Sequence, residues 1–425
     1  MTDDLMKSSG SRDAGNSTHA DEQRLYPKVR FRGFDEPWKK VKLEEISERV
    51  NGNDNRFNLP VLTISAKTGW MTQEDRFSGD ISGKQKKNYT LLHKGELSYN
   101  HGNSKVAKYG AVFSLQNYSE ALIPHVYHSF KIIKETTPVF IENFFKKKDV
   151  NKQLRKYISS SARMDGLLNI SYSDFMKVHL FISQKISETK QIDKIFEILN
   201  SLLSLQQRKL ELMKQLYRYL LENLNTEKKH PNIFIKGNYS HWNKVKLSDL
   251  GEIRTGKTPT PSVRSNYTNI GMPFVTPTEI VDLYNYNTSR FISNSGLKKA
   301  QIAPKGSILV TCIASIGKNT CVFKEKVAFN QQINAVTPNS FNDSIFLAFK
   351  SLQWSKRIDC LTANTAMQII NKKDFSNIET MVPNLNEQKD ISKIWLKSYS
   401  LTYKYSDAKK LIIRLKKFLL QNLFI

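Results

Sequence analysis

The sequence predicts an α/β protein built from two copies of one unit, each closed by a long helix. The segment Trp38–Ile46 returns as Trp242–Leu250, with Trp, Lys, Val and Leu at matching positions. Each half ends in a stretch whose apolar residues recur every three or four positions, as in an amphipathic helix. We therefore expect two duplicated α/β domains separated by two long helices, which form an antiparallel coiled coil with pseudo-two-fold symmetry.

The ends of the two halves also match, whereas their middles differ. Glu188–Ile195 corresponds to Glu387–Ile394, and Leu220–Leu224 corresponds to Leu419–Leu423. This pattern indicates a shared frame that carries two different binding surfaces. A duplicated protein suits a partner that is itself two-fold symmetric, and duplex DNA is the commonest such partner.

Composition points to a polyanionic partner. The 425 residues are too many for one core, and their formal net charge is +26. Nucleic acid is the first candidate partner and an anionic membrane surface the second. The alternative is a lysine-rich surface that only keeps the protein soluble. Because basic residues are spread along both halves, two basic domain surfaces are favoured over a basic arm.

The cysteines and the hydropathy pattern indicate a reduced, soluble protein. Cys312, Cys321 and Cys360 show no zinc-site spacing, which favours free thiols in the cytoplasm. No apolar run approaches the length of a membrane span, and the N-terminus lacks a signal-peptide core. We therefore expect a cytoplasmic protein with no membrane partner.

The chain is expected to divide at four points. Residues 1–25 are polar and predict a disordered tail. Residues 26–185 and 229–383 then form the two α/β domains. Short apolar runs bounded by Gly, Asn and Lys clusters predict strands in both domains, at Val61–Ile64, Ala111–Leu115, Pro273–Thr276 and Ser307–Val310.

The long helices are expected at residues 186–228 and 384–425. The first has a heptad register with one polar break at Gln206, and would be about 60 Å long. The second is preceded by Asn384, which can cap it, with Glu387 three residues on. We expect the two helices to pair as a rod that holds two DNA-reading domains apart, over an unread stretch of DNA. The alternative is that each helix packs only on its own domain.

One segment matches a nucleotide-binding pattern. Gly251–Thr258 fits the P-loop pattern G-x-x-x-x-G-K-[ST], in which a helix begins at the lysine and its amides hold phosphates. Pro259 and Pro261 would both fall in that helix, and Pro261 is too deep to be tolerated. The first copy also has no Gly-Lys-Thr. We interpret the match as chance, and keep a P-loop nucleoside triphosphatase as an alternative function.

Other catalytic signatures are missing from the sequence. There is no amino-methyltransferase tetrapeptide, no G-x-G-x-x-G after a strand and no metal-ligand spacing among the histidines. We therefore assign no catalytic residue and no metal ligand.

Polar and basic loops in the middle of each half are the candidate DNA contacts. Lys and Arg bind phosphates or guanine, whereas Asn and Gln can read adenine. The candidates in the first half are Lys67, Lys84, Lys86, Lys87, Asn88, Asn100, Asn103 and Lys105. Those in the second half are Lys257, Thr258, Thr276, Thr278, Ser315, Lys318, Gln331 and Gln332.

Four motifs carry a resemblance to a known family. They are Pro27-x-x-Arg30-Phe31-x-Gly33-Phe34 with Trp38, Gly256-x-Thr258-Pro259 followed by Pro273–Pro277, Asn330–Ala335, and Pro383-x-x-x-Glu387-Gln388-x-x-Ile391. From about Tyr26 onward the chain resembles the specificity subunit of type I restriction-modification enzymes. The first half departs from the last motif, with Gln184 in place of Pro383 and Thr189 in place of Gln388, which leaves the start of its helix less well defined.

The resemblance implies two target recognition domains, one for each half of a bipartite DNA site, and a coiled coil that sets the spacer. It implies a subunit without catalytic activity and without a bound cofactor. Methyltransferase subunits, two for each chain, would bring S-adenosylmethionine, and restriction subunits would bring translocation and cleavage with ATP and Mg. A third possibility, unrelated to this family, is a duplicated interaction scaffold that binds no specific DNA; its DNA affinity would be weak, indiscriminate and lost at moderate salt.

Overall fold

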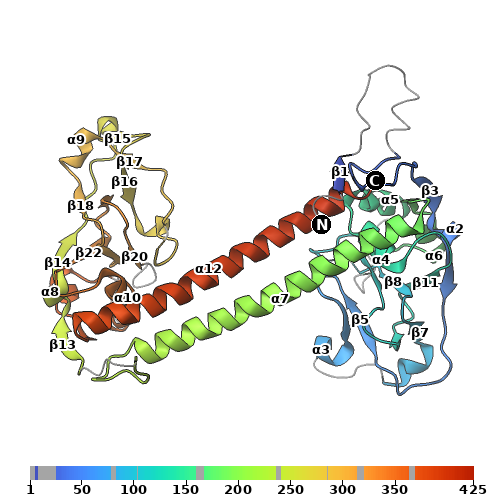
Figure 1. Ribbon diagram of the computed structural model, residues 1–425, viewed down its shortest axis with the longest axis horizontal. Coiled ribbons are helices and arrows are strands. Elements are labelled where there is room, and N and C mark those ends of the chain that lie inside the picture. Colours follow the sequence, from blue (N-terminus) through green and yellow to red (C-terminus); the bar gives the residue numbers. More distant parts are fainter. Residues whose placement is uncertain are drawn as a thin grey trace. The chain divides into compact units, whose positions relative to one another are not determined.

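The chain divides into two compact units in the computed structural model. One unit combines Met1–Leu205 with Lys409–Ile425, and the other is Gln206–Ala408. The structure describes residues 5–7, 25–77, 83–102, 104–158, 167–235, 241–284, 286–313, 320–362 and 369–425. Each unit is a body of mixed strands and helices that also contains part of both long helices (Figure 1).

The first unit is organised around a four-stranded antiparallel sheet. Its strand order is β4 (Ser47–Val50), β11 (His128–Ile132), β8 (Leu97–Asn100) and β9 (Ala111–Ser114). Four antiparallel pairs accompany it: β1 (Leu5–Lys7) with β2 (Val29–Phe31), β3 (Lys39–Lys42) with β12 (His179–Ile182), β5 (Leu62–Ser65) with β6 (Gly69–Thr72), and β7 (Thr90–His93) with β10 (Glu120–Ile123).

The first unit also contains several short helices. They are α2 (Leu43–Ile46), α3 (Gln73–Phe77), the 3-10 helix η1 (Gly83–Asn88), α4 (Pro138–Phe145), α5 (Lys148–Tyr157) and α6 (Tyr172–Met176). Pro138 begins α4, where a proline costs no backbone hydrogen bond, and the Thr137 side chain accepts from the backbone N–H of Phe140. Phe140 on α4 and Phe175 on α6 are fully buried and contribute to the largest core of the unit.

The second unit repeats the same central sheet. The order β14 (Gly251–Thr255), β22 (Ile333–Pro338), β19 (Ile308–Thr311), β20 (Thr320–Val322) matches β4-β11-β8-β9, and β13 (Asn243–Lys246) pairs with β23 (Glu379–Val382) as β3 pairs with β12. The middle differs, because a five-stranded mixed sheet is present: β15 (Tyr267–Thr268), β17 (Phe291–Ile292), β16 (Met272–Val275), β21 (Val327–Phe329), β18 (Gln301–Ala303). A duplicated frame with divergent middles is thereby confirmed.

The helices of the second unit also follow the first, with one difference. They are α8 (Leu247–Leu250), the 3-10 helices η2 (Arg264–Asn266) and η3 (Pro277–Glu279), α9 (Asn294–Leu297), α10 (Ser344–Thr362) and α11 (Lys372–Ser376). The single helix α10 stands where the first unit has α4 followed by α5. The four predicted strands are confirmed as β5, β9, β16 and β19, each within one residue of the expected bounds.

Part of the expected N-terminal tail is a strand. Leu5–Lys7 pairs antiparallel with Val29–Phe31, so the expectation of disorder over residues 1–25 is not met at these positions. Backbone pairing with the free edge of β2 needs no particular side chains, which is why composition did not predict it. The rest of residues 1–24 lies outside the described residues.

The two long helices are α7 (Ile186–Leu224) and α12 (Leu385–Asn422). In the first unit the beginning of α7 packs against the end of α12, where the rings of Phe196 and Phe424 are 5.8 Å apart. In the second unit the end of α7 packs against the beginning of α12, where Trp395 Nε1 donates to Leu220 O at 3.4 Å. Both ends show that the helices run antiparallel.

Helix pairing and packing on the domain occur together. Ile192 and Leu199 share one buried core with Leu419 and Leu423, and this core also includes the sheet of the first unit. The polar break in the heptad has a partner in the second unit, since Gln206 Nε2 donates to Tyr405 O at 3.1 Å. The alternative in which each helix packs only on its own domain is therefore wrong.

The start of α12 agrees with the sequence-based prediction, whereas the end of α7 differs slightly from it. The Asn384 side chain accepts from the backbone N–H of Glu387 at 3.0 Å, which confirms the predicted cap. Helix α7 stops at Leu224, four residues before the expected end. The next three residues, Asn225–Glu227, leave the helix: Asn225 donates to the backbone oxygen of Phe349 on α10, and Glu227 accepts from the side chain of Lys350 on α10 and from the backbone N–H of Met381 on β23.

In both units the long helix forms a hydrogen bond with the residue that precedes α4 or α10, but the donor and the acceptor are exchanged between the units. In the first unit Thr137, the cap of α4, donates to the carboxylate of Asp193 on α7. In the second unit the carboxylate is on the residue before the helix: Ser392 on α12 donates to Asp343 at 2.5 Å, and Asp343 accepts from Phe346 N at 2.8 Å. Asp193 and Ser392 occupy matching positions in the repeat.

Asp193 makes the stability of the first unit depend on pH. Burial, with Glu197 and Glu142 nearby, raises its pKa to about 7. Because the folded-state pKa is raised, its contribution to stability is full below the ordinary aspartate pKa and is lost as pH rises through about 7. Between pH 5 and 8 the parent should therefore lose up to about 3 kcal/mol of unfolding free energy through this group, and we expect Asp193→Asn, which keeps the acceptor for Thr137, to remove that loss.

The measurement is chemical denaturation of both proteins between pH 5 and 8. Glu222→Gln, at an exposed position of α7, removes one carboxylate without burial and should leave the pH profile of the parent unchanged. Parallel profiles for Asp193→Asn and the parent would contradict the assignment.

Candidate nucleic-acid interface

One edge of the second unit gathers the ends of several strands. Strand β16 runs parallel to β21, so both end at the same edge, and Asn330 N donates to Val275 O at 3.1 Å just beyond them. Strand β14 ends beside the start of β22, where Thr255 is paired with Asn334. The loops after β14, β16 and β21 therefore lie together, and six of the predicted contact residues are on them.

The Gly256–Thr258 loop packs tightly against the loop after β21. Gly256 N donates to Ile333 O and Lys257 N donates to Phe329 O, both at 3.0 Å. The hydroxyl of Thr258 donates to Gln331 Oε1 at 2.5 Å. These contacts bring the predicted residues Lys257, Thr258 and Gln331 onto adjoining loops, and leave the side chains of Lys257 and Gln331 exposed.

The same contacts do not fit a P-loop. In a P-loop the amides that follow the glycine point at phosphate oxygens from the start of a helix. Here the amides of Gly256 and Lys257 are already donated to backbone carbonyls, and residues 256–260 form no helix. The interpretation of Gly251–Thr258 as a chance match therefore has a structural reason, and the geometry does not support a nucleotide site.

A second loop of this edge contains Thr276 and Thr278. Thr276 precedes the 3-10 helix η3 and forms a capping box with Glu279. Arg290 donates to Thr276 Oγ1 at 3.0 Å and to Glu279 at 2.8 Å, which holds the loop. The Thr278 side chain is exposed. Sequence reasoning missed Arg290, because it is 14 residues from Thr276 and only the fold brings them together.

The third loop, Asn330–Gln332, is locked by its own side chains. Asn330 Nδ2 donates to Gln332 Oε1 at 2.9 Å, and Gln332 N donates to Asn330 Oδ1 at 3.2 Å. Gln332 is half-buried, whereas Gln331 is exposed. Of the two predicted glutamines only Gln331 is thus exposed, on a loop that the side chains of Asn330 and Gln332 hold.

In the first unit the predicted residues lie in two separate places. Asn100, at the end of β8, donates to Ile64 O at 3.0 Å and accepts from Gly102 N at 3.0 Å. Its amide therefore joins the β5–β6 turn to the loop after β8. Lys67 is exposed on that turn and Lys105 on that loop.

The η1 lysines are at the other end of the β5–β6 pair. Gln73, which follows β6, donates to the hydroxyl of Tyr89 at 3.0 Å, and Asn53 donates to Lys87 O at 3.0 Å. Lys87 and Asn88 are exposed there, and Lys86 is half-buried. The side chain of Lys84, and residues Asn103, Ser315 and Lys318, lie outside the described residues.

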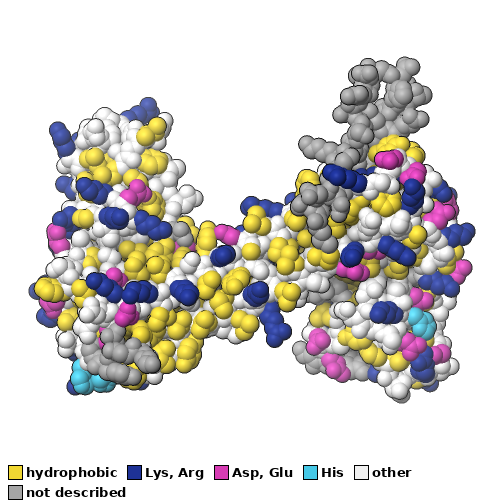
Figure 2. Space-filling model, in the orientation of Figure 1, with side chains coloured by type: hydrophobic (Ala, Val, Ile, Leu, Met, Phe, Trp, Pro, Cys, Tyr) yellow, Lys and Arg dark blue, Asp and Glu magenta, His cyan; other side chains and the backbone are white. Residues whose placement is uncertain are grey.

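Lysine and arginine side chains are distributed over both units on the face shown in Figure 2, with few acidic side chains on the second unit. Some of them are paired, such as Lys131 with Glu48 at 2.9 Å and Lys244 with Glu379. This agrees with the expectation of two basic surfaces in place of a basic arm.

The buried histidines and cysteines have structural environments. His101 and His128 stack at 4.8 Å, and burial lowers the pKa of His128 to about 4, so it is neutral at physiological pH. Burial raises the thiol pKa of Cys312 and Cys321 to about 12, which makes both inert as nucleophiles. Across the described ranges, no cluster of His, Cys, Asp and Glu could hold a metal ion, and no helix is long and apolar enough to cross a membrane.

Comparisons with known proteins converge on one family. Residues 239–410 match the model of the type I restriction modification DNA specificity domain. The type I restriction enzyme HindI specificity subunit of Haemophilus influenzae is 30% identical over 151 residues, which are 33% of this chain and 32% of that protein. The putative MjaX specificity subunit of Methanocaldococcus jannaschii is 25% identical over 262 residues, 57% of each chain.

A solved structure shares the fold. The type I restriction-modification system S subunit from M. genitalium has a TM-score of 0.59 at 14% identity, and the match covers 93% of this chain and 97% of that one. In contrast, the sequence matches span about a third of the HindI subunit and just over half of the MjaX subunit. The resemblance to specificity subunits is thereby confirmed.

The close approach of the two loops predicts that Gly256 tolerates no side chain. A Cβ built at this residue would lie 1.9 Å from Asn330 O. We expect Gly256→Ala to push the loops apart and to lower the free energy of unfolding of the second unit by at least about 2 kcal/mol. Thermal unfolding followed by circular dichroism would measure it.

Lys257→Ala is the neighbouring control, since the exposed Lys257 side chain can be shortened without steric conflict and should leave the unfolding temperature unchanged. Equal stability of Gly256→Ala and the parent would show that the packing of these loops is not as described.

Proposed function

Since residues 239–410 match the model of the type I restriction modification DNA specificity domain, we propose that this chain is a non-catalytic subunit that recognises a bipartite double-stranded DNA site. The observation that carries the proposal is the edge of the second unit, where Lys257, Thr278 and Gln331 are exposed on adjoining loops. The repeated sheet order extends the proposal from the second unit to the first.

The exposed side chains at this edge have the chemistry of DNA readout. A lysine fixes position through phosphate, and a glutamine amide can bond adenine in the major groove. The loops that present them are held by internal hydrogen bonds from Asn330 and Arg290. Rigid loops lose less conformational entropy on binding, which favours specificity.

Two units with different loops would each read one half of the site. The helix α7 has 39 residues and a length of about 58 Å. A paired helix of that length is stiff enough to set a fixed spacer between the two half-sites. The DNA between them would then go unread.

Exposed hydrophobic side chains on the long helices support docking of partner subunits. Leu205 and Leu411 in the first unit are 58% and 61% exposed, and Leu212 and Tyr403 in the second are both 51% exposed. Figure 2 shows hydrophobic side chains along the helices. Such exposure on soluble helices marks protein–protein contact. We propose that two methyltransferase subunits dock on these helices and supply S-adenosylmethionine, and that restriction subunits supply ATP- and Mg-dependent chemistry.

Selection from a random duplex library tests the bipartite reader. The chain, co-expressed with the methyltransferase subunit of its host, is expected to enrich two short motifs at one fixed spacing at physiological salt. Exchange of residues 38–183 for another such domain should then change one motif only. One continuous motif, or none, would refute two-headed recognition and favour the scaffold.

Two substitutions at the edge of the second unit should have different effects. Lys257→Ala is expected to weaken binding about equally for all sequences and to reduce the salt slope by about 1, as for a phosphate contact. Gln331→Ala should cost about 1–3 kcal/mol at one position of one motif and relax its specificity. Titrations of cognate and single-mismatch duplexes at several salt concentrations would measure both.

The same variants address the remaining alternative. A P-loop triphosphatase would lose all activity on Lys257→Ala, so ATP hydrolysis by the parent that disappears in this variant would overturn the proposed role of the loop.

A further inference from the structure

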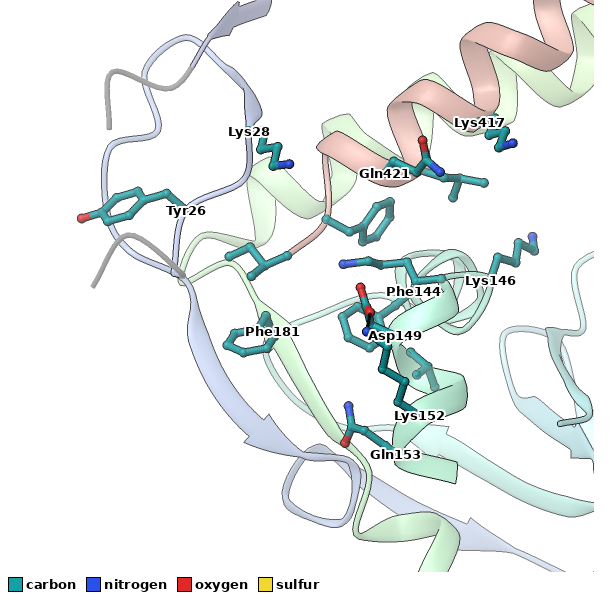
Figure 3. Close-up of a pocket in the computed structure, with 15 residues that line it drawn as sticks. Tyr26, Lys28, Phe144, Lys146, Asp149, Lys152, Gln153, Phe181, Lys417 and Gln421 are labelled. Atoms are coloured by element: carbon teal, nitrogen blue, oxygen red, sulfur yellow. Dashed lines mark hydrogen bonds and ion pairs between the residues drawn. The ribbon is translucent and has the colours of Figure 1, made fainter. Parts of the chain in front are cut away.

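A hollow of about 890 Å³ lies beside the end of α12 in the first unit. Figure 3 shows Phe144 and Phe181 around it. Phe424 also lines the hollow, and it follows the repeated segment that ends each long helix, as Asn225 does in the second unit. The ring of Phe424 packs on α4, 4.9 Å from the ring of Phe140, just as Asn225 bonds to α10. The hollow therefore belongs to the packing at the helix end, and we assign no ligand to it.

The central sheets identify a different pair of counterparts, which is exposed in both units. Strand β4 continues the first Trp segment and β14 continues the second, so Val50 and Arg254 are counterparts. Val50 pairs with Ser129 on β11, and Arg254 pairs with Ala335 on β22. Ser129 and Ala335 therefore occupy the same position, and the residues before them correspond one by one.

The turn before each of these strands is the same. In Pro124–Tyr127 and in Asn330–Ile333 the backbone N–H of the last residue donates to the oxygen of the first, at 3.1 and 3.2 Å. Counting back along β11 and β22 gives the two turns the same position in the frame. The second residue of the turn is Gln331 in the second unit and His125 in the first, and both side chains are exposed.

The neighbouring strand holds each turn at the same backbone oxygen. His101, which follows β8, has its Nε2 atom 2.9 Å from Val126 O. Cys312, which follows β19, donates its backbone N–H to Gln332 O at 2.8 Å. The third residue of each turn is thereby fixed, so the exposed second residue is presented by a turn that is held in place.

The turn of the first unit meets the loops that contain predicted phosphate contacts. Asn100 Nδ2 donates to the hydroxyl of Tyr127 at 3.3 Å and to a backbone oxygen of β5 at 3.0 Å. Lys67 is exposed on the turn after β5, and Lys105 is exposed on the loop after β8. His125 is therefore grouped with these two lysines, and not with the lysines of η1 at the other end of the β5–β6 pair.

A histidine and a glutamine suit different bases. Glutamine bonds adenine through one donor and one acceptor. An imidazole keeps at least one N–H donor in every protonation state. In the major groove guanine presents two acceptors, N7 and O6, whereas adenine sets an amino donor beside its N7. An exposed histidine in place of a glutamine therefore favours guanine over adenine.

We propose that His125 is a specificity-determining residue of the first unit and donates a hydrogen bond to N7 of one guanine in the half-site that this unit reads. Gln331 would have the same role in the other half-site, and Lys67 and Lys105 would bind phosphates beside the guanine. This role rests on the proposed DNA recognition and deepens it, because it assigns a base to a residue that the sequence motifs did not indicate.

The test is a titration of the full chain, in complex with the methyltransferase subunit of its host, with the duplex that library selection enriches. The half-site of the first unit is the motif that changes when residues 38–183 are exchanged. Each guanine of that motif, on either strand, is replaced in turn by 7-deazaguanine, which keeps Watson–Crick pairing and lacks N7. We expect one such replacement to weaken binding by the parent at least about fivefold, as for loss of one base contact.

Two variants of the turn assign that contact. His125→Ala should bind the unmodified duplex at least about fivefold more weakly than the parent, and should lose nothing further on 7-deazaguanine at that position. His125→Gln gives the turn the residue of the second unit and should shift the preference at that position from guanine towards adenine. Because His125 is exposed, neither change should affect folding.

His93→Ala is the matched control. His93 is exposed in the same unit and lies opposite Glu120 at the start of β10, whereas the turn with His125 follows the end of β10. This variant should keep the affinity of the parent and its sensitivity to 7-deazaguanine. Loss of that sensitivity in His93→Ala, with His125→Ala unaffected, would move the reading surface to the other end of β10 and overturn the role of His125.

The other outcomes separate the role of His125 from the proposed function. A bipartite motif whose first half contains no guanine sensitive to the replacement, or sensitivity that persists in His125→Ala, would overturn this role and leave two-headed recognition standing. Absence of a bipartite motif would count against DNA recognition itself, and against the role of His125 with it.

Discussion

A hydrogen bond between a tryptophan and a glutamate holds each unit to its long helix. Trp38 Nε1 donates to Glu188 at 3.1 Å, and Trp242 Nε1 donates to Glu387 at 3.0 Å. All four side chains are buried. A buried carboxylate is stable only when its charge is compensated, and in the first unit Arg30 donates to Glu188 at 2.7 and 2.9 Å. The indole precedes the first strand of each frame and the glutamate lies in the first turn of each long helix, so this bond fixes where the helix leaves the sheet.

The rest of each unit can vary because this frame does not. Both central sheets keep one strand order, and both have the Trp segment paired with the strand before the helix. The regions between these elements form two-stranded pairs in the first unit and a five-stranded mixed sheet in the second. Loops on different secondary structure present different side chains, as expected for two surfaces that read different sequences. Under the proposed function, the frame would preserve the assembly and the loops would determine which DNA sequence is bound.

Comparison of the two units also shows a contact whose position is kept although its donor and acceptor are exchanged. Asp193 receives a hydrogen bond from Thr137, whereas Ser392 donates one to Asp343. The frame requires one hydroxyl and one carboxylate at this junction, and either residue can supply either group. A duplicated chain thus contains its own reference for how an exchanged position is satisfied.

The sequence by itself determined the duplication, the strands near the frame, the long helices and the cap at Asn384, because these depend on local periodicity and on residues close in the chain. It also indicated the loops at the edge of the second unit, where Lys257 and Gln331 lie on adjoining loops. Only the tertiary structure decided that the amides of Gly256 and Lys257 are bonded to carbonyls, that the amide of Asn100 is engaged in holding two loops, and that Arg290 supports Thr276. Each of these depends on pairing between strands that are far apart in sequence. A pattern of residue types shows which groups are present, but hydrogen bonds across a sheet decide which of them remain available to a ligand.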